Sequence, residues 1–245
     1  MIDIHCHILP AVDDGSQSME DSLAMARIAA NDGTRILFTT PHGLGSAYNV
    51  SPARRDEARE ELQRAIDQEG IPLKLVPGME CWATNLTFEQ ALEQPACFMN
   101  TPFGAPRNPD LPLLVEMPPT MNLAILPDLL FQAQLKGITL LLAHVERYAA
   151  MEKHGDMLME LMEKGMLAQF NASSVRSSFF PGAKEKLIRK LMQTFPEQVL
   201  LGSDAHSVDN RPPILSCARK AIEKWLGKDG WTLLAEENPR RLLLL

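Results

Sequence analysis

The amino-acid sequence predicts an α/β fold in which short parallel strands alternate with helices. Seven short apolar segments are separated by amphipathic segments that carry helix-start and helix-stop residues. Such alternation is typical of parallel strands joined by right-handed crossovers. The chain has 245 residues, of which 45% are hydrophobic, and this suits a single domain spanning residues 1–245. Seven units of this kind favour a closed barrel, with an open sheet as the alternative.

The predicted strands are short apolar runs. In chain order they are residues 2–5, 36–40, 73–77, 113–117, 139–143, 167–171 and 199–203.

The segments between the strands have recognisable helix ends. The residues from Ser18 to Asp21 resemble a capping box, and Gly33 is placed to stop the helix that follows. Pro127 occupies the place of a first helical residue, where its missing N–H is tolerated. The predicted helices cover residues 18–32, 52–69, 127–136, 156–164, 182–194 and 213–226. Residues 81–112 contain five prolines and are predicted to form an extended loop with one helical stretch at 87–93.

Charge and composition exclude several classes of protein. The net charge of −7 argues against general nucleic-acid binding, which needs clustered Lys and Arg. There is neither a signal-like N-terminal segment nor an apolar run long enough for a bilayer, so we expect a cytoplasmic protein without membrane insertion. The four cysteines include no C-x-x-C pair and are expected to be reduced thiols. The leucines at 242–245 are expected to pack against the body of the protein or a partner chain, as in a homo-oligomer.

Nine side chains with metal-binding groups follow the predicted strands. His5 and His7 are two residues apart at the end of the first strand, so they face the same side. Functional residues of a parallel barrel collect at the carboxyl ends of its strands, and we expect the nine to meet there. They are His5, His7, Asp14, His42, Glu80, Glu116, His144, Asp204 and His206.

Each of these residues by itself has an ordinary structural explanation. A single carboxylate such as Glu80 after a strand is usually solvated. Asp204 and His206 alone would be a helix cap and a packed histidine, and His154 is predicted to lie on the surface. Such separate explanations account poorly for the nine residues together, because five of the six histidines lie at strand ends. Nine ligands suit two or three divalent ions, and mixed nitrogen and oxygen donors without thiolate suit Mn, Fe or Zn.

The chemistry predicted for this set is metal-assisted hydrolysis. Neighbouring divalent ions clamp a phosphoryl oxygen and activate a water for in-line attack, so phosphate esters are the natural substrates. Arg147 and Arg211 lie near the ligands in sequence, and arginine offers a charged bidentate fork for phosphate. A surface salt bridge is the alternative for each. Together with Asp14, these arginines are the predicted catalytic residues.

Two other mechanisms are excluded by spacing. A cysteine-based phosphatase needs an Arg six positions after its Cys, whereas Cys6, Cys81, Cys97 and Cys217 are followed there by Val12, Thr87, Phe103 and Glu223. Neither G-x-x-x-x-G-K-[ST] nor G-x-G-x-x-G occurs, so nucleotide binding of those types is not supported.

Together these residues resemble a known superfamily. The ordered series H-x-H, D, P-H, P-G-x-E, E, H-x-E-R-Y, S-D-A-H-S and R-P-P is similar to PHP (polymerase and histidinol phosphatase) proteins. Within that superfamily the sequence most resembles the CpsB/CapC-type protein-tyrosine phosphatases of bacterial capsule and exopolysaccharide systems. The likeness extends from Met1 to about Arg219, and its most specific parts are residues 1–10 and 143–148.

The resemblance implies a distorted (β/α)7 barrel with a trinuclear site, commonly manganese, at the carboxyl ends of the strands. It implies a first ion held by His5, His7, Glu80 and Asp204, a second bridged by Glu80 and held by Glu116 and His144, and a third held by Asp14, His42 and His206. Arg147 and Arg211 would contact phosphate.

The predicted function is a metal-dependent phosphomonoesterase acting on phosphotyrosine in proteins, with a bacterial tyrosine kinase as the partner that the resemblance implies. The candidate walls of its entrance are Leu44, Tyr48, Phe103 and Tyr148. One alternative is a small-molecule phosphatase of the histidinol-phosphate type. An amidohydrolase also begins with H-x-H, but the Asp204-x-His206 pair counts against it. The non-enzyme alternative is a regulatory metal-binding protein.

Overall fold

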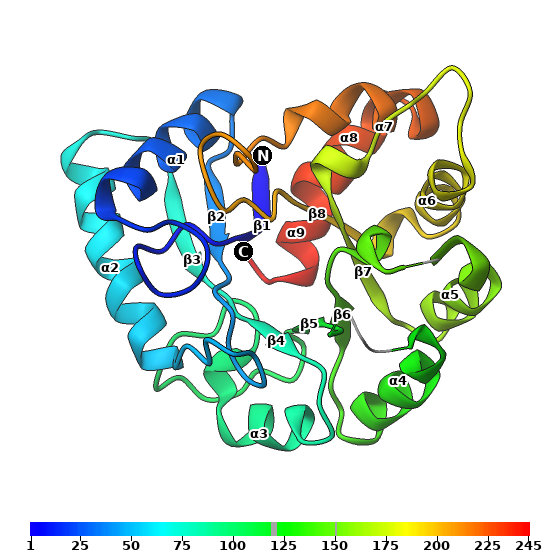
Figure 1. Cartoon of the computed structure of the whole chain (residues 1–245), viewed down its shortest axis with the longest axis horizontal. Helices are drawn as coiled ribbons and strands as arrows, with labels where there is room; N and C mark the ends of the chain where they lie inside the picture. The colour runs from blue at the N-terminus through cyan, green and yellow to red at the C-terminus, as the bar shows by residue number, and fades with distance from the viewer. Residues whose placement is uncertain (119–121, 150) are drawn as a thin grey trace.

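Two parallel sheets surrounded by helices form the core of the protein (Figure 1). The computed structural model describes residues 1–118, 122–149 and 151–245. The first sheet has the order β1-β2-β3, with β1 at Ile2–Cys6, β2 at Ile36–Thr39 and β3 at Lys74–Pro77. The second has the order β4-β5-β6-β7-β8, with β4 at Glu80–Trp82, β5 at Leu113–Glu116, β6 at Leu140–Leu142, β7 at Leu167–Asn171 and β8 at Val199–Gly202.

Backbone hydrogen bonds join the two sheets at two places, once between β1 and the segment after β8 and once between the segment after β2 and β4. Cys6, the last residue of β1, forms a parallel bridge with Ala205, which follows β8, and Asp204 N donates to His5 O at 2.7 Å. Glu80, the first residue of β4, forms a second parallel bridge with His42, which follows β2. Both junctions therefore consist of residues that the sequence marks as metal ligands, or of their immediate neighbours.

Strand β4 was not predicted. The sequence predicts one strand at 73–77 and a loop with one helical stretch over 81–112, but Glu80–Trp82 pairs in parallel with β5. Only Gly78 and Met79 separate β3 from β4, and a Cβ on Gly78 would lie 2.9 Å from Thr40 Cγ2. This close approach lets the chain pass directly from one sheet to the other. A three-residue strand has too little apolar pattern to be recognised from sequence.

Seven of the α-helices in the described ranges agree with the predicted ends at most positions, and the last two, beyond residue 227, were not predicted. In chain order the helices are α1 (Met19–Asp32), α2 (Pro52–Gln68), α3 (Thr87–Glu93), α4 (Leu126–Leu135), α5 (Gly155–Glu163), α6 (Ala183–Thr194), α7 (Arg219–Leu226), α8 (Lys228–Thr232) and α9 (Asn238–Leu242). Ser18 caps α1 by accepting from Asp21 N, and Gly33 ends it with a positive φ of 101°. The helix predicted from residue 213 begins only at Arg219. A 3-10 turn at Ser216–Ala218 precedes it, and Asp32 Oδ2 accepts the backbone N–H groups of Leu215 and Ser216.

The C-terminal segment covers the end of the sheets opposite to the ligands. The Asn238 side chain in α9 donates to Val199 O, at the start of β8, at 2.8 Å, and the amino group of Met1 lies 3.6 Å from Glu236. Leu243 is fully buried, as expected from packing against the body of the protein, whereas Leu244 and Leu245 are exposed.

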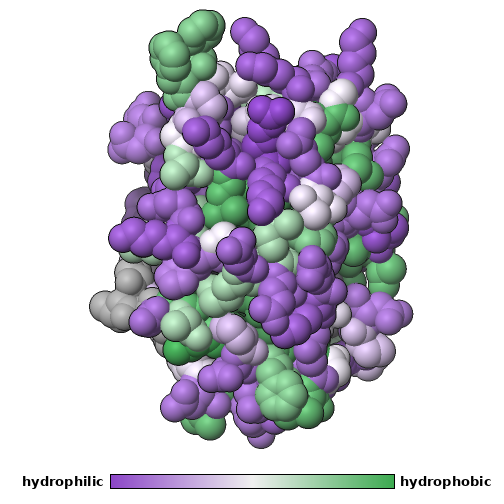
Figure 2. Space-filling model, turned by 90° about the vertical axis from the view of Figure 1, so that its right-hand side faces the viewer, coloured by the Kyte–Doolittle hydropathy of each residue, from purple (hydrophilic) through white to green (hydrophobic). Residues whose placement is uncertain are grey.

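The flank of the molecule that carries α4 to α6 is mostly hydrophilic (Figure 2). One hydrophobic group projects from its upper edge, where Figure 1 places the loop before α6; that loop contains Phe179 and Phe180, which are 90% and 87% exposed. None of the helices in the described ranges combines the length and apolar character needed to cross a bilayer.

Arg55 is a fully buried charge that ties α2 to the proline-rich segment. Its guanidinium donates to Ala96 O at 2.6 Å, to Thr101 O at 3.0 Å and to the carboxylate of its neighbour Asp56 at 3.0 Å. The segment around residues 95–102 has little regular structure of its own, so this one side chain supplies several of its tertiary hydrogen bonds.

We expect Arg55→Met to lower the free energy of unfolding by about 3 kcal/mol, because it leaves buried carbonyl groups and a carboxylate without their partner. Urea denaturation followed by circular dichroism measures the change. The matched control is Arg54→Ala on the exposed face of α2, whose effect should stay within about 0.5 kcal/mol. Equal stability of the two variants would contradict this role of Arg55.

Candidate metal centre

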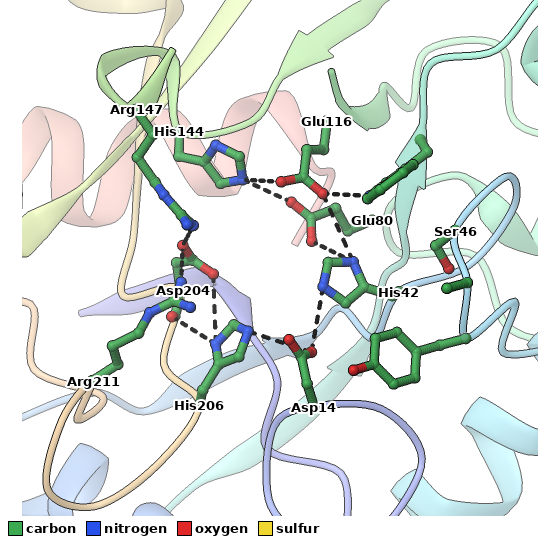
Figure 3. Close-up of a pocket in the computed structure, with 13 residues that line it drawn as sticks. Asp14, His42, Ser46, Glu80, Glu116, His144, Arg147, Asp204, His206 and Arg211 are labelled. Carbon is green, nitrogen blue, oxygen red and sulfur yellow. Dashed lines mark hydrogen bonds and ion pairs between the residues drawn. The ribbon is translucent and has the colours of Figure 1, made fainter. Parts of the chain in front are cut away.

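A cavity of about 210 Å³ opens at the carboxyl ends of the strands, and most of the predicted site residues line it (Figure 3). Seven of the nine predicted ligands and both predicted arginines contribute to its wall: Asp14, His42, Glu80, Glu116, His144, Asp204, His206, Arg147 and Arg211. His5 and His7 are buried behind this lining and still reach it, since their Nε2 atoms lie 3.4 and 3.3 Å from Glu80 carboxylate oxygens.

His5 and His7 are oriented with their Nε2 atoms toward each other, 3.2 Å apart. Gln169 fixes the first ring: its Oε1 accepts the backbone N–H of His144 at 2.6 Å, so this atom is an acceptor and the Nδ1 of His5, 3.1 Å away, must donate to it. Asp13 fixes the second ring, because its carboxylate accepts from His7 Nδ1 at 2.8 Å. Both Nε2 atoms are thereby directed at the centre of the cluster, as metal-ligating histidines are.

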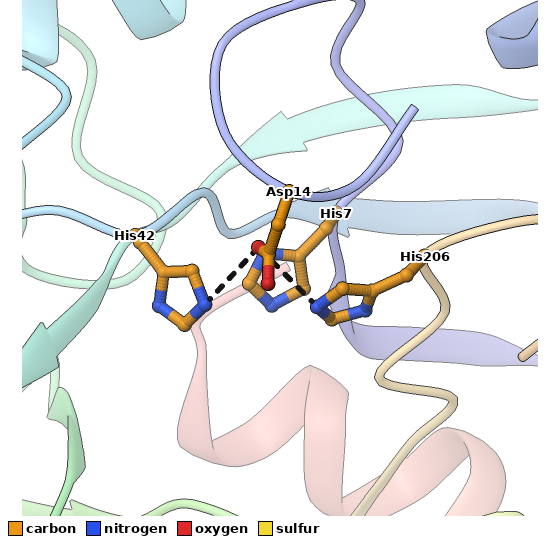
Figure 4. Close-up of side chains that lie close together, drawn as sticks. All are labelled: His7, Asp14, His42 and His206. Carbon is orange, nitrogen blue, oxygen red and sulfur yellow. Dashed lines mark ion pairs between the residues drawn. The ribbon is translucent and has the colours of Figure 1, made fainter. Parts of the chain in front are cut away.

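The ligand atoms form three overlapping groups whose members lie within 4.8 Å of one another. One group is His5, His7 and Glu80; another is His42, Glu80 and Glu116; the third is His7, Asp14, His42 and His206 (Figure 4). These groups agree in part with the three ligand sets that the family resemblance implies. Asp204 Oδ1 lies 3.7 and 3.6 Å from the Nε2 atoms of His5 and His7. His144 Nε2 lies 3.0 Å from Glu80 Oε1 and 3.3 Å from Glu116 Oε1.

The cluster favours positive charge at its centre. Burial by itself would lower the pKa of His42, but Asp14 and Glu80 raise it to about 9. Burial would also lower the pKa of His144, which Glu116 and Glu80 raise to about 10. Without a cation, protons on these rings balance the carboxylates, and bound cations would displace them.

Two further observations show that the residues present fit divalent cations. His42 Nδ1 is buried 3.1 Å from Glu80 Oε2, yet it has no hydrogen bond of suitable geometry within the described ranges. Burial and the positive charges of His7 and Arg211 lower the pKa of His206 to about 3, so its ring is neutral and has a free lone pair. Imidazole nitrogens and carboxylate oxygens without thiolate are the donor set of Mn, Fe or Zn sites.

Arg147 and Arg211 meet at one carboxylate oxygen. Arg147 Nη1 donates to Asp204 Oδ2 at 2.8 Å, and Arg211 Nη2 forms an ion pair with the same atom. Asn171 Nδ2 donates to it as well, at 2.8 Å. Both guanidinium groups lie partly exposed in the cavity wall and could therefore turn toward a bound phosphate, which is a bidentate acceptor.

Several residues that position the ligands were missed in the sequence. Gln169 and Asn171 lie two apart on β7, the strand to which no ligand was assigned, and both face the cluster. Trp82 Nε1 donates to Glu116 Oε2 at 2.6 Å. Two polar residues at i and i+2 in the otherwise apolar segment 167–171 were the available signal. They were overlooked because amides are seldom metal ligands for these ions.

The predicted entrance walls are only partly correct. Tyr48 lines the cavity, and its ring stacks on His42 with centroids 5.7 Å apart and planes 12° apart. Tyr148 is buried, and its hydroxyl accepts from Met117 N at 3.1 Å, so it is a packing residue. Leu44 is buried too. Phe103 is exposed but belongs to the loop held by Asp56, outside the lining.

Comparison with known proteins agrees with this geometry. The model of the family described as capsular polysaccharide synthesis, CpsB/CapC, matches residues 1–244. The chain belongs to this family. The tyrosine-protein phosphatase YwqE of Bacillus subtilis (strain 168) is 32% identical over 237 residues, covering 96% of this chain and 89% of that protein. The tyrosine-protein phosphatase CpsB of Streptococcus pneumoniae is 28% identical over 247 residues, covering 100% and 98%. The expected family membership is thus confirmed.

Solved structures of the family have the same fold. A chain from the crystal structures of YwqE from Bacillus subtilis and CpsB from Streptococcus pneumoniae, described as unique metal-dependent tyrosine phosphatases, superposes with a TM-score of 0.82 at 32% identity, covering 100% of this chain and 94% of that one. The phosphotriesterase homology protein of Escherichia coli superposes with a TM-score of 0.60 at 11% identity, covering 98% and 97%, which shows a shared fold alone.

We expect Gln169→Ala to weaken divalent-ion binding about ten- to hundredfold, the usual effect of losing a residue that orients metal ligands. The substitution removes the acceptor of both His5 Nδ1 and the His144 N–H. Calorimetric titration with Mn²⁺ measures the affinity, and circular dichroism checks that the fold is retained. Gln193→Ala, which removes a hydrogen bond to Trp225 O outside the cavity, is the control and should bind Mn²⁺ normally. Unchanged affinity in the Gln169 variant would refute the orienting role.

Proposed function

We propose that this protein is a metal-dependent phosphomonoesterase that hydrolyses phosphotyrosine in proteins. The observation that carries the proposal is the convergence of nine metal-binding side chains and two arginines at one cavity. Membership of the CpsB/CapC family supports it, because relatives covering nearly the whole chain are tyrosine-protein phosphatases. The small-molecule alternative uses the same residues and is separated from the proposal by the substrate experiment below.

The proposal includes two or three divalent ions, with Mn the favoured element and Fe or Zn as alternatives. His5, His7, Glu80, Glu116, His144 and Asp204 would hold the buried part of the site, and Asp14, His42 and His206 would hold the part nearest the opening. Ions in such a site polarise phosphoryl oxygens and lower the pKa of a bound water.

The other residues of the cavity act on the substrate. Arg147 and Arg211 bind the phosphate by exchanging their contacts with Asp204 for contacts with phosphoryl oxygens. Tyr48, at the edge of the cavity, offers an aromatic face for the phenyl ring of the substrate. A phenolate leaves without a strong acid to protonate it, because the tyrosine hydroxyl ionises with a pKa of about 10.

We further infer that the two sheets together form the distorted (β/α)7 barrel expected from the sequence, in which β3 and β4 occupy one strand position. The two backbone bridges between the sheets support this description. The proposed physiological substrate is a bacterial tyrosine kinase of capsule or exopolysaccharide synthesis, in line with the description of the family.

Protein purified after growth in metal-replete medium should carry two or three transition-metal ions per chain. Elemental analysis measures them, and dialysis against EDTA should remove both the ions and the phosphatase activity, which Mn²⁺ should restore. His5→Ala should lose one ion, because its Nε2 is directed at the cluster. Content of one ion or fewer in the replete protein would refute a multinuclear site.

Aryl phosphates should be hydrolysed at least about tenfold faster than alkyl phosphates, a difference of about 1.4 kcal/mol in activation free energy. The reason is the better phenolate leaving group and the aromatic wall at Tyr48. Steady-state rates on phosphotyrosine peptides, phosphoserine peptides and histidinol phosphate provide the measurement. A preference for histidinol phosphate would assign the protein to small-molecule metabolism and leave the metal chemistry intact.

A further inference from the structure

Two additional hollows adjoin the catalytic cavity at its opposite ends. Figure 3 shows Arg211 at one end of the cavity and Ser46 at the other, with the metal ligands between them. Arg211 also lines a second hollow of about 230 Å³, and Ser46 also lines a third of about 460 Å³. Both side hollows lie beyond the metal ligands, so a substrate that extends past its phosphate in both directions would reach them.

The hollow beyond Arg211, which we call the arginine pocket, has two arginines in its wall, of which Arg211 is paired with Asp204. Its polar wall consists of Asn171, Ser173, Arg176, Ser203, Asn210 and Arg211. No carboxylate contributes to this wall among the described residues, in a chain with a net charge of −7. Asp32 lies nearby, but its carboxylate already accepts the N–H groups of Leu215 and Ser216 at 2.8 and 3.0 Å.

Arg176 is held in place at this pocket. Its Nε donates to Ser173 O at 2.8 Å, which anchors the guanidinium beside the end of β7. For its two terminal nitrogens, no hydrogen bond is found within the described parts of the chain. Arg211 is engaged by Asp204 and faces the phosphate site, whereas Arg176 lies outside the metal cluster. A second anionic group of the substrate would therefore meet Arg176.

The hollow beyond Ser46, which we call the amide groove, has a different character. It is lined by Ser46, Asn49, Ser51, Thr84, Gln90 and Gln94, together with a few apolar groups, and no charged side chain contributes among the described residues. Amide and hydroxyl side chains both donate and accept hydrogen bonds, so they suit the peptide groups of an extended chain irrespective of its sequence.

We propose that an extended phosphopeptide crosses the whole mouth, from the amide groove to the arginine pocket, and that Arg176 selects substrates with an acidic residue close to the phosphotyrosine. This inference rests on the proposed function and adds a substrate class to it. The electrostatic preference concerns one side of the phosphotyrosine alone, because the amide groove at the other end is uncharged.

The test uses the Mn²⁺-loaded enzyme and three phosphotyrosine peptides of equal length, whose flanking residues are Glu, Gln or Lys. A small aryl phosphate is assayed in parallel. The wild type should show kcat/KM values about fivefold higher for the Glu peptide than for the Gln peptide, an effect of the size measured for a single exposed charge pair. This ratio should fall as salt is added.

Variants then assign the preference to Arg176. Arg176→Gln should bring the ratio close to one, and Arg176→Glu should reverse it so that the Lys peptide becomes the better substrate. Arg189→Gln, a matched change on the exposed face of α6, should leave the ratio at its wild-type value.

Each other outcome is decisive. Equal kcat/KM of the wild type on the three peptides would overturn the inference while activity on the aryl phosphate sustains the proposed function. A preference that survives in both Arg176 variants would also overturn it. Absence of activity on every phosphate ester would refute the proposed function itself.

Discussion

The buried carboxylate of Glu80 is the interaction on which the site and much of the fold depend. Its two oxygens lie within 3.0 to 3.4 Å of ring nitrogens from four histidines: His5, His7, His42 and His144. Its backbone also joins the two sheets, because Glu80 N donates to Pro41 O and Glu80 O accepts from Gly43 N. One residue thus fixes the strand junction and the centre of charge at the same point.

A buried carboxylate is costly unless it is surrounded by compensating charge. Protonated histidine rings supply the positive charge that compensates the Glu80 carboxylate. A metal cation bound at the same place would supply it in their stead. Close backbone contacts make the arrangement possible. A Cβ on Gly202 would lie 2.6 Å from His5 Cβ, so glycine at this position lets β8 approach the first ligand closely, and a Cβ on Gly43 would displace the side chain of Met79, whose Sδ lies 2.1 Å away.

The carboxylate of Asp204 links the histidine cluster to the two arginines. Asp204 contacts the histidine cluster through one oxygen and the two arginines through the other. It therefore couples the place where cations would bind to the place where phosphate would bind.

The sequence by itself determined the alternation of strands and helices, the ends of most helices and all nine candidate ligands. These features depend on local pattern: apolar runs, capping residues such as Ser18, and histidines or carboxylates directly after strands. The tertiary structure alone decided the short strand β4, the positioning roles of Gln169 and Asn171, the burial of Tyr148 and the place of Arg176 beside the cavity. Each of these depends on contacts between segments far apart in the chain, and such contacts leave no periodic or positional pattern within a single segment.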